Sequence, residues 1–205
     1  MNVRHSQQRS TDRGFSILEL VIAMAITLSV MAAATTLLAT SLRTRGRENT
    51  RSEALASTQR ALNIMSREIG NAGYGLANNG IVLADSSDSS IRVRANLDNN
   101  SSLAGTDEDI RFVFQNPSSV TGSIVRYDNS GGGNVVLATN ISGLLLTYFD
   151  VNGNTIENSV DYDDAERLTI EVKVELPAGL EQPATTLKLV SDIALRNAPN
   201  TLAGF

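Results

Sequence analysis

The sequence predicts an α+β fold, with one long N-terminal α-helix packed on a globular head that contains an antiparallel β-sheet. Residues 15–42 form an uninterrupted apolar run, and residues 43–69 continue with an amphipathic helical pattern. Beyond residue 80 the pattern changes to short alternating runs, which are typical of half-buried strands. The helix is therefore expected to have a transmembrane half and an amphipathic half, followed by a β-rich head.

Four segments follow from this pattern. We expect a polar leader at residues 1–14, a membrane-spanning helical half at residues 15–42, an amphipathic helical half at residues 43–70 and the head at residues 71–205. The leader carries more basic than acidic residues, as expected for a segment that stays on the inner side of a membrane. From Asn71 onward there are 17 acidic and 8 basic residues. This acidic head argues against direct binding of nucleic acid, because the phosphates would be repelled.

The apolar run has the length and composition of a membrane helix. At ~1.5 Å per residue it would extend about 42 Å, which exceeds the ~30 Å hydrocarbon thickness of a bilayer. Glu19 is its only charged residue, and neither proline nor glycine interrupts it. The run is therefore expected to form a continuous helix that can cross a membrane.

The helix is expected to continue beyond the membrane edge, because apolar residues recur there at helical spacing. These residues are Leu55, Leu62, Met65 and Ile69. We expect Met65 and Ile69 to pack on the sheet, with Arg67 and Glu68 facing water. The glycine and asparagine residues at positions 70–80 offer the geometry for a helix end and a turn.

Seven short segments of the head have the composition of strands. They are Ile91–Ala95, Ile110–Gln115, Ser123–Asp128, Asn134–Ala138, Leu144–Val151, Arg167–Leu176 and Thr186–Arg196. Asn152-Gly153 is a strong signal for a two-residue hairpin loop. The three consecutive glycines at 131–133 predict a flexible turn between two strands.

The composition argues against an enzyme. The chain has no cysteine, which excludes a disulfide, a thiolate metal site and a cysteine nucleophile. Its single histidine, His5, lies in the leader, so a Ser-His-Asp triad or a histidine-ligated zinc site in the head is excluded. We therefore expect neither catalytic activity nor a cofactor.

An acidic cluster in the head admits three interpretations. Asp161, Asp163, Asp164 and Glu166 could be a solvated loop, a calcium site or a pair of catalytic carboxylates. The run at residues 150–154 also offers oxygen ligands, but its glycine comes too early for an EF-hand and no glutamate closes the loop. We favour the solvated loop and keep Asp161, Asp163 and Asp164 as weak calcium candidates.

The leader meets the apolar run at Gly14-Phe15-Ser16-Ile17-Leu18-Glu19. This junction resembles the processing motif of type IV prepilins, in which a glycine precedes the cleaved bond, a phenylalanine follows it and a glutamate is fifth in the mature chain. The resemblance implies cleavage between Gly14 and Phe15 by prepilin peptidase, N-methylation of Phe15 and an assembly role for Glu19. It also implies that the predicted fold is pilin-like.

A physical argument supports the assembly role of Glu19. A carboxylate inside a bilayer costs several kcal/mol unless it is paired or neutralised. Cleavage before Phe15 would create an ammonium group four residues away, and a helix N-terminus also stabilises an anion. Pairing of Glu19 with the terminal amine of its own chain or of a neighbour would favour one axial register between subunits. The alternative is that Glu19 lies at the lipid headgroup level without a specific role.

Two further segments are similar to a subgroup of this family. TQRALNIMSREIGNAGYG at residues 58–75 and LVSDIALRN at residues 189–197 look like PilW-type minor pilins and the related J-type pseudopilins of type II secretion. Major pilins often carry a proline near the middle of the span, where this chain has Thr36, and many close a C-terminal loop with a disulfide. Both absences favour a minor pilin or pseudopilin over the main shaft subunit.

These resemblances imply a structural function. The chain would be a minor pilin that initiates or caps a type IV pilus, or alternatively a pseudopilin at the tip of a type II secretion pseudopilus. Its partners would be other major and minor pilins through the N-terminal helix, prepilin peptidase and the inner-membrane assembly platform. It would cross the inner membrane once, with the head on the periplasmic side, before it enters the filament.

Two other interpretations of the N-terminus stay open. A secretory signal peptide could end near Ala32-Ala33-Ala34, although the apolar run is about twice the expected length and contains Glu19. The chain could also be a membrane-anchored periplasmic binding domain that is never cleaved. The mature N-terminus distinguishes both from a processed pilin.

Overall fold

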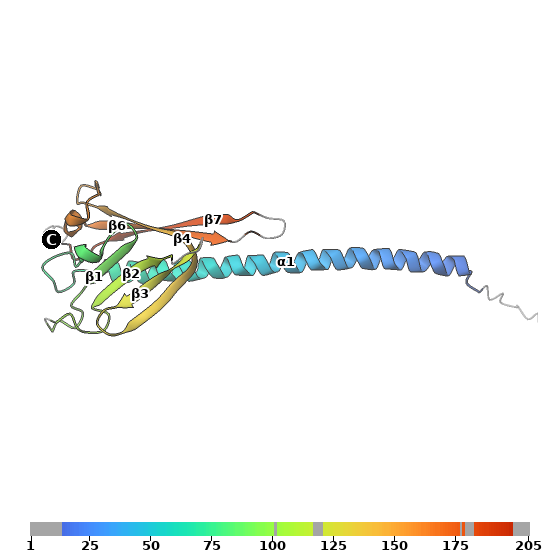
Figure 1. Cartoon of the computed structure of the whole chain (residues 1–205), viewed down its shortest axis with the longest axis horizontal. Coiled ribbons are helices and arrows are strands. Elements are labelled where there is room, and N and C mark those ends of the chain that lie inside the picture. Colours follow the sequence, from blue (N-terminus) through green and yellow to red (C-terminus); the bar gives the residue numbers. More distant parts are fainter. Residues whose placement is uncertain (1–13, 101, 117–120, 177, 179–182, 199–205) are drawn as a thin grey trace, which may run out of the picture. The chain divides into compact units, whose positions relative to one another are not determined.

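The computed structural model describes residues 14–100, 102–116, 121–176, 178 and 183–198 (Figure 1). Residues 1–13 of the predicted leader, which include its charged residues and His5, lie outside the described residues. The chain groups into two compact units, Met1–Glu48 and Asn49–Phe205. The first contains the N-terminal part of helix α1, and the second contains the rest of α1 and the strands.

Helix α1 extends from Ile17 to Gly70, a length of 54 residues. It begins two residues after the start of the apolar run, because the carbonyl of Ser16 accepts the first helical hydrogen bond, from the backbone N–H of Leu20 at 3.1 Å. It ends at Gly70, where the chain enters the predicted glycine-rich turn.

Within the described residues, the head is built on a seven-stranded antiparallel sheet. The strands are β1 Ser90–Arg94, β2 Asp109–Gln115, β3 Gly122–Asp128, β4 Gly133–Phe149, β5 Thr155–Ile156, β6 Arg167–Leu176 and β7 Thr185–Ala194. Their order is β1-β2-β3-β4-β6-β7, with β5 paired to β4, and two short 3₁₀ helices, η1 Leu83–Asp85 and η2 Ser159–Asp164, lie in the connections. The predicted α+β fold, with a long helix and an antiparallel sheet, is confirmed (Figure 1).

The prediction of two separate strands at Asn134–Ala138 and Leu144–Val151 is wrong, because both belong to β4. The residues between them are of turn-forming types, but they are accommodated as bulges. Opposite β3 the pairing skips Asn140, which has a φ of 60°. β4 pairs with β3 over residues 133–141 and with β6 over residues 141–149, so a single bent strand joins the two parts of the sheet.

The connection between β4 and β5 is a hairpin loop, but it contains residues 150–154 and is longer than the two residues predicted. Gly153 has a φ of 81°, as the glycine signal requires. The carboxylate of Asp150 accepts hydrogen bonds from the backbone N–H of Asn152 at 2.9 Å and of Asn154 at 2.7 Å. Side-chain and backbone hydrogen bonds from Asn154 lower the pKa of Asp150. The polar run considered for calcium therefore has a local structural role.

One face of the second half of α1 forms the core together with the inward side chains of the strands. The buried residues of this face are Ala54, Thr58, Ala61, Leu62, Met65, Ile69 and Gly70. The apolar members lie in one cluster with residues of β1, β2, β3, β4, β6 and β7, so the predicted packing of Met65 and Ile69 is confirmed. Leu55 is only half-buried, because the inward face passes through Ala54 and Thr58 instead.

The prediction that Glu68 faces water is wrong. Its Oε2 accepts a hydrogen bond from Nε of Arg126 on β3 at 2.8 Å, and the two side chains are only 17% and 12% exposed. Arg126 also forms an ion pair with Asp107. Arg67, by contrast, is exposed as predicted. A largely buried, hydrogen-bonded ion pair therefore joins the C-terminal end of α1 to the sheet.

A second buried carboxylate, Asp109, joins β1 to the loop that follows β3. It accepts hydrogen bonds from Nε and Nη2 of Arg92, both at 2.7 Å, from Nε of Arg94 at 2.9 Å and from Nδ2 of Asn129 at 3.1 Å. Burial by itself raises the pKa of Asp109, but these hydrogen bonds outweigh burial and lower the pKa to about 2. The folded state therefore favours the ionised carboxylate.

We expect Asp109 to contribute on the order of 1–2 kcal/mol to stability, after allowance for solvent screening. This contribution is complete above the unfolded pKa of 3.8 and is lost as the pH falls towards about 2, because protonation then accompanies unfolding. Urea unfolding of the full chain in mild detergent would measure it, with the near-UV circular dichroism of the stacked Tyr148 and Tyr162 rings as the signal.

In that experiment, Asp109→Asn should be less stable at neutral pH and should lack this part of the acid sensitivity. Glu157→Gln, at an exposed position, serves as the control and should behave as the unmodified chain does. Equal acid sensitivity of Asp109→Asn and the unmodified chain would contradict the assignment.

Candidate functional site

The Gly14–Phe15 bond lies in an exposed, non-helical stretch immediately before α1. Gly14, Phe15 and Ser16 are outside the helix, and Phe15 is 80% exposed. A Cβ atom added at Gly14 would meet no atom within 4 Å, so the described part of the chain does not itself require glycine there. A requirement for glycine at this position would therefore come from a binding partner such as a processing enzyme. The bond is accessible, as a cleavage site must be.

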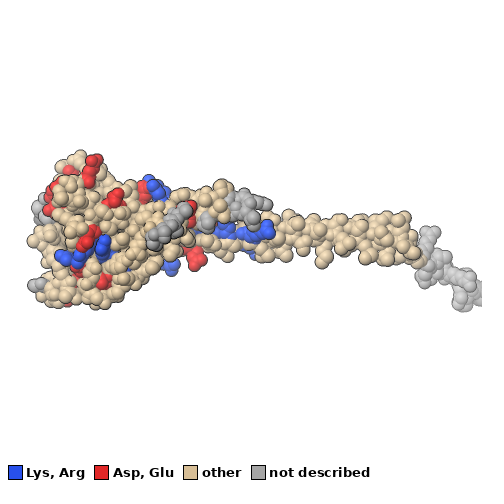
Figure 2. Space-filling model, in the orientation of Figure 1, with Lys and Arg blue, Asp and Glu red and all other residues tan. Residues whose placement is uncertain are grey.

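The first unit exposes a continuous apolar surface along α1. In Figure 2 the visible face of this stretch is tan, and its large apolar side chains are all more than half exposed. They are Ile17, Leu18, Leu20, Val21, Ile22, Met24, Ile26, Leu28, Val30, Met31, Leu37, Leu38 and Leu42. Among the described residues, α1 is the one helix that is long and apolar enough to cross a membrane. Such a surface needs lipid or apolar partners to cover it.

Five hydroxyl groups within this apolar stretch are satisfied by the helix itself. The side chains of Thr27, Ser29, Thr35, Thr36 and Thr40 each donate to a backbone carbonyl three or four residues earlier, at 2.7–2.9 Å. A polar side chain in a water-free environment is costly without a hydrogen bond, so this arrangement suits a lipid or protein interior. These residues therefore do not need partners from outside the helix.

Glu19 differs from these hydroxyls. It lies in the first turn of α1 and is exposed, and no hydrogen bond or ion pair joins it to another described residue. The positive end of the helix dipole is close to its carboxylate and stabilises the charge. Glu19 is therefore an anionic group on an apolar surface whose partner must be sought outside the described residues.

Among the described residues of the head, the acidic side chains do not form a metal site. Asp161, Asp163 and Asp164 lie exposed in η2 or at its end, and no group of three or more metal-ligating side chains occurs among the described residues. The described residues therefore do not support the calcium interpretation of Asp161, Asp163 and Asp164.

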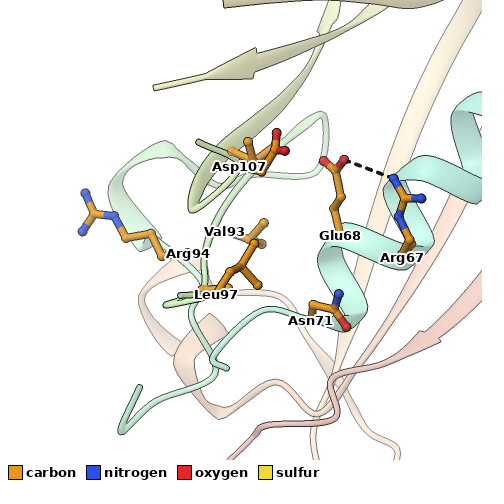
Figure 3. A pocket seen from close by; sticks show the side chains of 9 residues that line it. Arg67, Glu68, Asn71, Val93, Arg94, Leu97 and Asp107 are labelled. Atoms are coloured by element: carbon orange, nitrogen blue, oxygen red, sulfur yellow. Dashed lines mark ion pairs between the residues drawn. The ribbon is translucent and has the colours of Figure 1, made fainter. Parts of the chain in front are cut away.

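A hollow of about 150 Å³ lies between the end of α1 and strands β1 and β2. Figure 3 shows Arg67 and Glu68 on the helix and Val93 on the opposite side, with the guanidinium of Arg94 turned away. The Glu68 and Asp107 carboxylates in its wall are already paired with Arg126. The hollow is smaller than the ~300–1,000 Å³ of typical ligand pockets, so we assign it no ligand.

Sequence reasoning missed the buried polar groups of the head. The ion pairs of Glu68 and Asp109 join residues far apart in the chain, and neither has a local sequence signal. Glu108 is 1% exposed and accepts hydrogen bonds from the backbone N–H groups of Leu97 and Gly105 at 2.8 and 2.9 Å. These groups hold strands and loops together, and they do not converge on one site.

Comparison with known protein families finds a match that falls on the N-terminal site. Residues 9–35 match the prokaryotic N-terminal methylation motif. The matched segment includes Gly14, Phe15, Glu19 and more than half of the apolar run. A search of curated proteins found no match.

The motif indicates a type IV pilin-like or pseudopilin-like substrate of prepilin peptidase, and it is typical of structural proteins that interact with pilus components. Together with the apolar part of α1, it fits a protein anchored in a membrane.

Proposed function

We propose that this chain is a minor pilin that helps to initiate or cap a type IV pilus. One observation carries the proposal: the methylation motif coincides with an accessible Gly14–Phe15 bond, and an apolar helix follows directly, with a carboxylate at Glu19 that no other described residue pairs with. Prepilin peptidase would hydrolyse this bond and methylate the new amine of Phe15. The mature chain would then start with a cation one helical turn from Glu19.

Assembly would move the apolar part of α1 from lipid into a bundle of similar helices. Lipid is already apolar, so this transfer gains little hydrophobic free energy, and packing and polar contacts must supply the preference. Because five hydroxyls of the apolar stretch are satisfied within the helix and Glu19 carries a charge, Glu19 is the group that gains most from a partner. Pairing with the Phe15 amine of the same or a neighbouring subunit would fix the axial register.

The minor class is favoured over the main shaft subunit by sequence features. The span has no proline, and the chain has no cysteine for a C-terminal disulfide. Residues 58–75 and 189–197 are similar to PilW-type minor pilins, and the first of these segments forms the end of α1 and the turn after it. The head would lie on the periplasmic side of the inner membrane. The partners of the chain would be other major and minor pilins, through the N-terminal helix, prepilin peptidase and the inner-membrane assembly platform.

The same two segments are also similar to J-type pseudopilins, so a place at the tip of a type II secretion pseudopilus is the second candidate. Deletion of the gene distinguishes the two. Loss of pilus-dependent twitching with normal secretion supports the pilus, whereas loss of secretion with normal twitching supports the pseudopilus.

The mature N-terminus tests processing directly. We expect the mass of the purified membrane-extracted protein to lack residues 1–14 and to include one methyl group on Phe15. The same protein produced without prepilin peptidase should keep Met1 and the leader. An intact leader in the functional protein would refute processing and favour an uncleaved membrane-anchored domain. A start near Thr35 would instead indicate a secretory signal peptide.

A further inference from the structure

Two exposed arginines follow directly after the apolar stretch of α1. Arg43 and Arg45 are both solvent-exposed, and neither forms an ion pair with another described residue. Three arginines, Arg43, Arg45 and Arg47, precede Glu48, which is the nearest acidic residue, so this segment of the helix carries a net positive charge. The first unit therefore combines a long apolar surface with an end of net positive charge.

The two arginines lie on different sides of the helix. At ~100° per residue their side chains leave the axis about 200° apart, and their Cα atoms differ by only ~3 Å along it. A protein surface would contact one side of the helix. A layer of lipid headgroups surrounds it and can reach both arginines at the same depth.

The position along the helix axis also matches a bilayer. Arg43 is 24 residues after Glu19, which corresponds to about 36 Å of helix. This length lies between the ~30 Å hydrocarbon core and the ~40–45 Å of a bilayer with its headgroups. A helix near the membrane normal can therefore place Arg43 in one headgroup layer and Glu19 in the other.

We propose that Arg43 and Arg45 bind the phosphates of anionic phospholipids in the leaflet nearer the C-terminal end of the span, and that they set the depth of the unassembled subunit. A guanidinium matches a phosphate in bidentate geometry, and the long side chain can extend from the apolar helix into the headgroups. When Arg43 and Arg45 lie in one headgroup layer, Glu19 lies in the opposite headgroup layer and enters an apolar environment only on assembly.

The inference rests on the membrane span required by the proposed function, but not on cleavage of the leader. Full-length chain in bilayers of phosphatidylcholine and phosphatidylglycerol tests it. Electron paramagnetic resonance of spin-labelled lipids reports which headgroup associates with the protein. We expect preference for phosphatidylglycerol, with a contribution of roughly fivefold per arginine.

The variants separate a specific effect from a general one. Arg43→Gln/Arg45→Gln should remove most of the preference, whereas Arg43→Lys/Arg45→Lys should keep most of it because the charge remains. Arg60→Gln/Arg67→Gln removes two exposed charges from the amphipathic half of α1 and is the matched control. An unchanged lipid preference in Arg43→Gln/Arg45→Gln would overturn the proposal.

A second readout separates this proposal from its rivals. The chain has no cysteine, so Ser29→Cys and Thr44→Cys give single labels in the middle and at the end of the span. If a water-soluble quencher reaches the Ser29 label, this part of the helix is not inside the membrane. That result would refute the membrane span and the proposed function that requires it. A different outcome is that the Ser29 label is protected, but Arg43→Gln/Arg45→Gln loses cross-linking between copies and keeps its lipid preference. This result would assign the two arginines to the acidic head of another copy and overturn headgroup binding.

Discussion

Replacing Gly80 by alanine is expected to destabilise the head by at least about 3 kcal/mol, which corresponds to a Tm lower by roughly 6–12 °C. Gly80 has a φ of 77°, where a side chain is strained. A Cβ atom there would lie 2.2 Å from the backbone N of Gly73 and 2.4 Å from the carbonyl O of Arg94. Those two atoms form a hydrogen bond of 2.9 Å with each other, so the new methyl group would separate them.

The backbones of Gly73, Gly80 and Arg94 lie in close contact, and this contact holds the end of α1 against the sheet. Gly73 follows the helix, and Gly80 accepts a hydrogen bond from the backbone N–H of Arg94 at 2.8 Å. Backbone atoms cannot move aside as a flexible side chain can. The loss is therefore expected to affect the docking of the helix end as well as the loop itself.

Gly153→Ala is the matched control. Gly153 has nearly the same backbone conformation, with a φ of 81°, but nothing lies within 4 Å of its Cβ position. Gly153→Ala should therefore lower the free energy of unfolding only by the backbone strain, about 1–2 kcal/mol. Thermal unfolding of the full chain in mild detergent, followed by near-UV circular dichroism, compares the two. Equal small losses for both variants would show that the backbone contact at Gly80 is looser than the structure indicates.

The regular elements of the fold could be predicted because their signals are local. The alternation at Arg167–Leu176 gave the bounds of β6, and the apolar spacing near Met65 gave the inward face of α1. The continuity of β4 could not be predicted, because a bulge at Asn140 and a true turn have similar residue types. The choice between them depends on the neighbouring strand.

The polar contacts of the head were not predictable for a related reason. Glu68 and Arg126 are 58 residues apart, and only the docking of α1 on the sheet brings them together. Before the fold is known, a glutamate next to an exposed arginine looks like a solvated charge. Asp109 similarly gains its four hydrogen bonds from β1 and from the loop after β3.

The N-terminal candidate site is the opposite case, since its motif is contained in a few consecutive residues and could be recognised directly. The structure adds two things that a motif cannot give: the accessibility of the Gly14–Phe15 bond and the internal hydrogen bonds of the hydroxyls in α1. Neither the motif nor the structure contains the partner of Glu19, because the proposal places that partner on a processed N-terminus or on another chain.

Replacing Glu19 by alanine is expected to leave cleavage and methylation intact but to reduce incorporation into the filament at least about tenfold, equivalent to about 1.4 kcal/mol. The reason is that the Phe15 ammonium would enter the helix bundle without a counter-ion, and breaking a buried pair by removing one partner is costly. The mass of the mature N-terminus measures processing, and immunodetection in sheared filaments against the membrane fraction measures incorporation.

The Glu19→Gln variant decides whether the charge of Glu19 or its ability to cap the helix is responsible for incorporation into the filament. Ser16 precedes α1 and Glu19 lies three residues later, a spacing at which a glutamate or glutamine side chain can hydrogen-bond the helix N-terminus. Glutamine keeps that capping ability and the shape but has no charge, so the pairing hypothesis predicts a defect as large as that of alanine. Glu19→Asp keeps the charge on a shorter side chain and should retain part of the incorporation. Normal incorporation of Glu19→Gln would show that the charge is not needed and would remove charge pairing as the cause of the axial register.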